Sequence, residues 1–247
     1  MVGSPLYSEL PTWNRSLAVR PLRQLSEDDL SIFYFKAMTT WGSVDDFRHF
    51  LPRIFEVLTT LPLGWEEWVA LDKLNYSQWR TWPEPEQTAV EAYLLAFWNE
   101  LLTTLDESAD AFCGHYFAAI ANVYPNVNEL LRRWEQAPSV GLIRLGCYAH
   151  DNYYDLRKKK RLSAFDQRTD LAPAVLAWLA TDTMLAQLES AFLPRPIRLW
   201  QRKYQALCSY WKRTGSVLPT NGRRDVVLFR YLPDYSSQFY PCQIYSM

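Results

Sequence analysis

Residues 39–58 read TTWGSVDDFRHFLPRIFEVL, and this stretch says more about the fold class than any other part of the chain. When residues 44–58 are plotted at roughly 100° per residue, their large apolar side chains gather on one side. That side holds Phe47, Phe50, Leu51, Ile54, Phe55 and Leu58. Asp45 and His49 fall on the opposite side, so the pattern predicts an amphipathic helix that packs by its apolar face.

The start of this helix carries its own signal. Ser43 precedes Asp46 by three residues, which resembles a capping box with Asp in place of the usual Glu or Gln. Asp45 and Asp46 then occupy the first turn, where the helix dipole stabilises each carboxylate by about 0.3–1 kcal/mol. Pro52 removes one helical hydrogen bond, so we expect a kink there or a division into two pieces.

The same residues allow a second interpretation as a metal site. Asp45 and His49 are four residues apart on one helix face, and with Asp46 they are the candidates for a metal-dependent hydrolase or nuclease. Two ligands do not make a site, and the sequence has no H-x-x-x-H or D-x-D cluster elsewhere. Helix capping is therefore the preferred interpretation, and we expect no catalytic residue, metal ligand or cofactor.

Helical periodicity continues through most of the chain. Further helices are predicted from a cap at SEDD (26–29) to Gly42, around GWEEWVALDKL, and at 83–105, 109–123, 127–136, 139–157, 173–192 and 194–213. The end is β-branched and aromatic, which predicts a small hairpin at about 224–246. The sequence thus predicts one all-α domain over residues 1–247. Its eight or nine antiparallel helices would form an irregular or HEAT-like array, although no clean repeat of 34 to 47 residues is found.

Composition limits the compartment and the chemistry. No segment is long and apolar enough to span a bilayer, and the N-terminus lacks the basic start and apolar middle of a secretory signal. The four cysteines (Cys113, Cys147, Cys208 and Cys242) form no C-x-x-C pair, so we expect reduced thiols in a cytoplasm. The 11 tryptophans and 15 tyrosines suit either a large buried core or partly wet contact surfaces.

The net charge of −1 conceals an asymmetry. Residues 1–140 hold 10 Lys and Arg against 19 Asp and Glu, a balance of −9. Residues 141–247 hold 16 against 8, a balance of +8. An acidic and a basic half fit two surfaces that serve different partners, or halves that attract each other.

One resemblance rests on two quoted blocks. KAMTTWGSVDDFRHFLPRIFEVL, followed by W-x-x-W-P-x-x-E at 79–86, is similar to a block in uncharacterised soluble bacterial helical proteins of similar size. The similarity covers roughly residues 26–105. It implies a cytoplasmic helical protein of bacterial type and implies no particular reaction.

A basic run and two histidines complete the candidate sites. The run is Arg157, Lys158, Lys159, Lys160 and Arg161, which suits phosphates or an acidic protein surface. It equally suits a solvated helix end, and the chain pI of 6.3 argues against nucleic acid as the leading partner. Cys113 with His115, and Cys147 with His150, are candidate thiol–base pairs, although histidines packed against aromatic residues are the commoner case.

Three functions remain open from the sequence. The preferred one is a non-catalytic protein that binds another protein, for example an immunity protein that neutralises a bacterial toxin. Its partner-binding residues would be Asp45 and Asp46 in the acidic half and Arg157 to Arg161 in the basic half. The alternatives are the metal-dependent enzyme and a nucleic-acid-binding helical protein that uses Arg157 to Arg161.

Overall fold

The structure is a computed structural model, and it describes residues 1–61, 66–162 and 168–192. The chain divides into two units, residues 1–193 and 194–247, and the described residues all belong to the first. The hairpin predicted at 224–246 and the helix predicted at 194–213 lie outside the described residues. The single-domain prediction for the whole chain stays a prediction.

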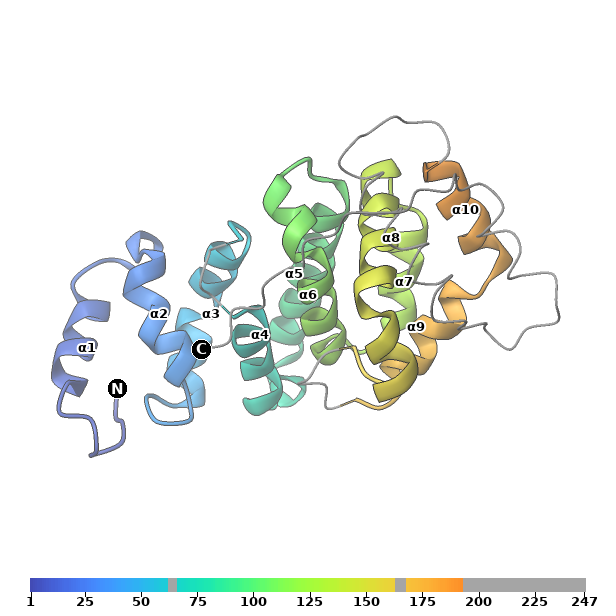
Figure 1. Cartoon of the computed structure of the whole chain (residues 1–247). Coiled ribbons are helices and arrows are strands. Elements are labelled where there is room, and N and C mark those ends of the chain that lie inside the picture. Colours follow the sequence, from blue (N-terminus) through green and yellow to red (C-terminus); the bar gives the residue numbers. More distant parts are fainter. Residues whose placement is uncertain (62–65, 163–167, 193–247) are drawn as a thin grey trace, which may run out of the picture. The chain divides into compact units, whose positions relative to one another are not determined.

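The described residues form an all-α structure, which confirms the predicted class (Figure 1). Its α-helices are α1 (Leu10–Ala18), α2 (Glu27–Lys36), α3 (Val44–Leu58), α4 (Glu67–Tyr76), α5 (Glu84–Thr103), α6 (Glu107–Val123), α7 (Val127–Glu135), α8 (Ser139–Tyr154), α9 (Leu171–Leu179) and α10 (Asp182–Phe192). Three short helical turns are added at η1 (Leu22–Gln24), η2 (Trp79–Thr81) and η3 (Asp155–Lys159). Within this part of the chain, β-structure is limited to two isolated bridges at Trp41.

Helix α3 forms as its sequence predicts. The Ser43 hydroxyl accepts a hydrogen bond from the Asp46 N–H, and the Asp46 carboxylate accepts one from the Ser43 N–H, so both halves of the capping box are present. All six predicted apolar residues are buried. Pro52 does not divide the helix, which continues through it from Val44 to Leu58.

Helix α2 is shorter than predicted. It ends at Lys36, before Gly42, and the residues between form a tight turn in which Met38 has a φ of 62°. The Lys36 carbonyl accepts N–H groups from this turn, including that of Trp41 at 3.2 Å. Trp41 then packs edge-on against Phe33, with ring centroids 5.3 Å apart. A tertiary aromatic contact therefore ends the helix, and the apolar stripe could not show this.

The segment 173–192, predicted as one helix, is two. Helix α9 ends at Leu179 and α10 begins at Asp182. The Thr181 hydroxyl accepts a hydrogen bond from the Met184 N–H at 3.3 Å, which caps α10 and makes a new helix start at that point.

The helices pack in two rows. The even-numbered helices from α2 to α10 each contact the next even-numbered one, and α5, α7 and α9 do the same in a second row. Helices of one row run parallel, because their contacts advance in step. Glu67 meets His115 and Asp72 meets Asn122 between α4 and α6, for example. The stacked rings of Phe55 and Tyr93, with centroids 3.7 Å apart, connect α3 to α5 in the second row.

Tryptophans build the core of this array. Trp41, Trp79, Trp82, Trp98 and Trp134 are all buried. The rings of Trp98 and Trp134 meet edge to face with centroids 5.0 Å apart, and both indole N–H groups donate to backbone carbonyls, those of Leu130 and Gly141. Of the two roles that the sequence left open for its aromatic residues, these five therefore fill the first, the buried core.

Basic side chains hold the ends of neighbouring helices. Arg144 of α8 is 2% exposed and donates to the Leu101 carbonyl at the end of α5, 2.8 Å away. It also donates to the Asp106 carbonyl and to the Asp110 carboxylate at the start of α6, at 3.2 and 2.7 Å. One guanidinium thus joins three helices and satisfies backbone carbonyls that would otherwise lack partners.

The same device recurs at other helix ends. Lys73 of α4 donates to the Ala37 carbonyl just after α2 at 2.8 Å, and burial lowers the pKa of this lysine. Arg80 donates to the Val123 carbonyl at the end of α6, also at 2.8 Å. Arg168 donates to the carbonyls of Ala121 and Tyr124, at 3.0 and 2.7 Å. Cations at the C-terminal ends of helices are favoured by the helix dipole.

Replacing Arg144 by methionine, which keeps most of the side-chain volume, should destabilise the fold. The Leu101 and Asp106 carbonyls would lose their donor inside the structure, so we expect the free energy of unfolding to fall by about 3 kcal/mol. Arg132→Met is the matched control, because Arg132 makes a surface ion pair with Glu129 and should cost at most about 1 kcal/mol. Urea unfolding followed by tryptophan fluorescence measures both. Equal losses in the two variants would contradict the role assigned to Arg144.

Candidate functional site

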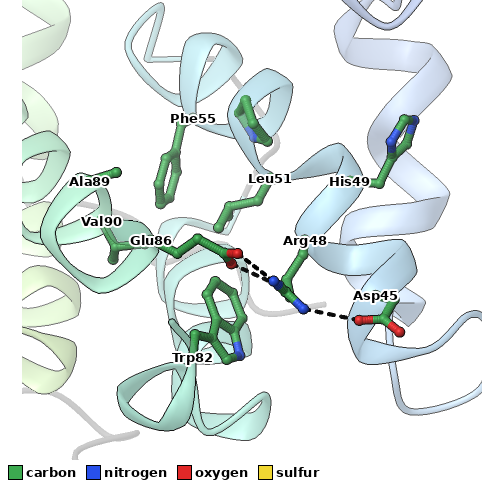
Figure 2. A pocket seen from close by; sticks show the side chains of 10 residues that line it. Asp45, Arg48, His49, Leu51, Phe55, Trp82, Glu86, Ala89 and Val90 are labelled. Carbon is green, nitrogen blue, oxygen red and sulfur yellow. Dashed lines mark hydrogen bonds and ion pairs between the residues drawn. The ribbon is translucent and has the colours of Figure 1, made fainter. Parts of the chain in front are cut away.

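A groove lies between α3 and the start of α5, with a volume of about 520 Å³ (Figure 2). Its lining consists of Asp45, Arg48, His49, Leu51, Pro52, Phe55, Trp82, Glu86, Ala89 and Val90. The residues come from two helices and from Trp82, which directly follows η2. We call this feature the α3–α5 groove.

The floor of the groove is apolar and fixed. Leu51, Phe55 and Val90 contribute side chains that are buried in the core. Phe55 is held by its stack on Tyr93, and the Tyr93 hydroxyl donates to the Phe55 carbonyl at 2.9 Å. Because these contacts already position the side chains, the floor is preformed and would not need to reorganise on binding.

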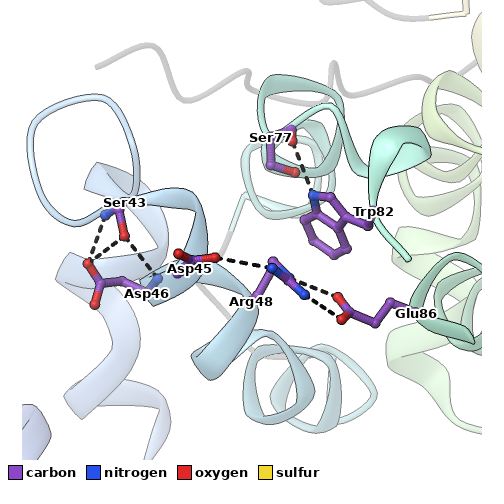
Figure 3. A network of polar contacts seen from close by, with 7 residues as sticks. All are labelled: Ser43, Asp45, Asp46, Arg48, Ser77, Trp82 and Glu86. Atoms are coloured by element: carbon purple, nitrogen blue, oxygen red, sulfur yellow. Dashed lines mark hydrogen bonds and ion pairs between the residues drawn. The ribbon is translucent and has the colours of Figure 1, made fainter. Parts of the chain in front are cut away.

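One arginine spans the mouth of the groove (Figure 3). Arg48 pairs with both carboxylate oxygens of Glu86, with Nε 2.8 Å from Oε2, and its Nη1 lies 3.1 Å from Asp45 Oδ1. The ion pair with Glu86 raises the pKa of Arg48 above its ordinary value. The guanidinium carbon also lies 5.5 Å from the centre of the Trp82 ring. The Trp82 N–H donates to the Ser77 carbonyl at 3.2 Å, which fixes the orientation of that ring.

The three residues considered as a metal site do not converge. Asp46 is engaged in the cap with Ser43, whereas Asp45 lies at the groove mouth with a side chain that is 88% exposed (Figure 3). His49 is exposed, packs edge-on against Phe50 with ring centroids 4.8 Å apart, and points away from the Arg48–Glu86 pair (Figure 2). Within the described ranges, no group of three or more His, Cys, Asp or Glu residues is arranged to hold a metal ion.

The basic run ends helix α8 and does not form one open face. Lys159 pairs with Asp155 at 2.8 Å inside the η3 turn. Lys160 has a φ of 54°, and the following Arg161 N–H returns to the Asp155 carbonyl at 3.4 Å. Lys158, Lys159 and Lys160 are exposed, while the two arginines of the run are half-buried. The contacts fit a helix end with favourable cations, and partner binding by this run stays a prediction.

The thiol–base pair at Cys113 and His115 is not assembled. The two positions are about 200° apart around α6. Cys113 is buried, and burial raises the pKa of its thiol to about 12, so the nucleophilic thiolate is not available near neutral pH. His115 instead lies 3.5 Å from the Glu67 carboxylate of α4, with a side chain that is 69% exposed. For the second pair, the side chain of His150 lies outside what the structure describes.

The residues that organise the groove are Arg48, Trp82 and Glu86, and the sequence interpretation did not select them as site residues. Their signal was present in the two quoted blocks, since Arg48 lies in FRHFLPRI and W-x-x-W-P-x-x-E contains both Trp82 and Glu86. What the sequence could not give is the pairing of positions 38 residues apart. That pairing depends on how α3 stacks beside α5.

Comparison of the chain with protein-family models, with curated proteins and with solved structures gives no significant match. The resemblance over residues 26–105 therefore stays a prediction. Among the described helices, none alone is long and apolar enough to cross a membrane, and only α9 and α10 together, bent by 61°, reach that length and hydropathy.

The capping role of Asp46 can be separated from a catalytic one. Asp46→Ala removes the hydrogen bond to the Ser43 N–H, so we expect the free energy of unfolding to fall by about 1 kcal/mol. Asp45→Ala, one position earlier in the same turn, removes only the ion pair of an exposed side chain and should cost less. Thermal unfolding and titration with Zn²⁺ or Mn²⁺ check the two variants. Tight metal binding that is lost in both variants would contradict the capping assignment.

The His115–Glu67 pair predicts a titration shift. The hydrogen bond from Glu67 raises the pKa of His115 above its ordinary value of about 6.5. The folded state therefore binds this proton more tightly, and the resulting stabilisation is complete below about pH 6.5 and lost as the pH rises through the folded pKa. NMR titration should show a raised midpoint for His115 that falls in Glu67→Gln. Glu56→Gln, at an exposed carboxylate on α3, should leave it unchanged, and an unshifted midpoint in Glu67→Gln would refute the pairing.

Proposed function

We propose that this protein is a non-catalytic binding protein whose helices form a HEAT-like docking platform. The observation that carries the proposal is the α3–α5 groove, which combines a preformed apolar floor with a polar rim. Protein interfaces have this anatomy, with a desolvated apolar centre and a solvated polar border. Stacked helix pairs in two rows also supply the extended surface that such proteins use.

Within this class, we propose an immunity protein that neutralises a bacterial toxin in the cytoplasm. The support is electrostatic, since residues 1–140 carry a balance of −9 and include every residue of the groove. An acidic face would accelerate association with a basic partner, such as a nuclease toxin whose active site binds nucleic acid. Asp45 lies at the groove mouth and belongs to this face. Asp46 contributes its charge nearby, although its carboxylate also caps α3.

The two alternative functions have less support in the described residues. A metal-dependent hydrolase would need Asp45, Asp46 and His49 to converge, and they point to different places. A nucleic-acid-binding protein would need the run from Arg157 to Arg161 to present its charges together. The turn at Lys160 and the Lys159–Asp155 pair work against such an arrangement.

The proposal is tested by finding the partner and blocking the groove. The full chain is used to capture proteins from its native host, and each captured protein is then produced alone and titrated against the chain by calorimetry. Ala89→Trp places a large side chain at the groove, and Ala96→Trp makes the same change at an exposed position two turns further along α5. We expect Ala89→Trp to weaken binding at least tenfold and Ala96→Trp to leave it unchanged.

Growth of cells that express the captured protein supplies the functional readout. An immunity protein should restore growth when co-expressed, and its Ala89→Trp variant should not. Equal binding by the two tryptophan variants would contradict the groove as the interface. Metal-dependent hydrolysis by the purified chain, lost in Asp45→Ala, would contradict the non-catalytic class.

A further inference from the structure

We infer that the α3–α5 groove receives a basic amphipathic segment of a partner protein, with an apolar side chain on the floor and lysine or arginine at the rim. This inference rests on the proposed function and adds the chemistry of the occupant. Three features of the groove carry it: the charge balance at its mouth, the engagement of its one arginine, and the shape of its floor.

The charge balance at the mouth is negative. Asp45 and Glu86 face each other across Arg48, so two carboxylates share one cation. Glu84 adds a third carboxylate, exposed in the same first turn of α5 as Glu86. A cationic side chain that enters here meets surplus negative charge, and an anionic one is repelled.

The arginine at the mouth is already engaged. Arg48 uses Nε and Nη2 for Glu86 and Nη1 for Asp45, and its guanidinium lies over the Trp82 ring. An anionic ligand would have to displace a carboxylate from this network and then lie beside it. An incoming cation displaces nothing, because Asp45 is 88% exposed and carboxylate oxygens accept several hydrogen bonds each.

The floor has the size and composition for apolar side chains. A volume of about 520 Å³ is within the range of pockets that bind drug-sized molecules, so it has room for more than one aliphatic or aromatic side chain. Pro52 and Ala89 are exposed on the two walls, and their short side chains leave the floor accessible between them. The site therefore calls for apolar and basic residues close together, which an amphipathic segment provides.

The chain contains a matched control for the rim charge. Helices α2 and α3 begin with the same device, a capping box of Ser26 with Asp29 and of Ser43 with Asp46. Asp28 and Asp45 occupy the same position in these two first turns, and both are exposed. Asp28→Asn and Asp45→Asn thus make equivalent changes to helix and net charge, and only the second lies at the groove.

The test uses a phage-displayed library of random 16-residue peptides, selected on the immobilised full chain. Enriched peptides are synthesised with a fluorophore and titrated by anisotropy at 50 and 200 mM NaCl. We expect sequences rich in Lys and Arg beside Leu, Ile or Phe, with weaker binding at the higher salt. Ala89→Trp should weaken binding at least tenfold, and Asp45→Asn about two- to fivefold, the effect of one exposed ion pair. Ala96→Trp and Asp28→Asn should change nothing.

Several results would overturn the inference. These are enrichment of acidic or uncharged peptides, an absence of enriched peptides, and binding that Ala89→Trp leaves intact although circular dichroism shows that variant to be folded. The native partner separates this failure from that of the proposed function. A partner that loses binding to Ala89→Trp but presents an acidic or uncharged segment ends the inference and leaves the proposed function standing. A partner that binds all variants equally ends both.

Discussion

The hydrogen bonds that basic side chains donate to the ends of neighbouring helices are the contacts on which this architecture depends. Parallel helices in a row place their carbonyl ends side by side, so partial negative charges accumulate where α2, α5 and α6 finish. Lys73, Arg144, Arg80 and Arg168 each bring a cation from another element to one of these ends. Each contact satisfies a backbone carbonyl and also fixes the position of the next helix.

The α3–α5 groove follows from the same packing at a place where it is less complete. Phe55 and Tyr93 hold the two helices together along part of their length, and Arg48 with Glu86 connects them near their starts. Between these contacts the side chains do not fill the space. The ion pair keeps the opening at a set width, so Arg48 supports the groove as well as contributing charge to its mouth. This explains why a site for recognition can occur in an otherwise ordinary joint between helices.

Local features of the fold could be predicted from the sequence, because they depend on residues a few positions apart. The cap at Ser43, the buried face of α3 and the extent of α5 are of this kind. Features set by distant contacts could not: α2 ends where Trp41 packs on Phe33, and the break before α10 depends on a threonine cap inside an apolar run. Asp45 was selected correctly as a residue of the groove rim, but its companions Arg48 and Glu86 required the stacking of α3 beside α5.

The spacing between stacked positions explains why no repeat is visible in the sequence. Contacts between successive helices of a row join residues 34 positions apart at Asp110 and Arg144, 38 at Arg48 and Glu86, and 50 at Asp72 and Asn122. Each joint therefore has its own length of connecting chain and its own polar contacts. Regular solenoids lengthen in evolution by copying one interchangeable unit. Here a copied helix pair would meet neighbours built for a different spacing, so this framework can diversify by substitution but cannot easily be extended.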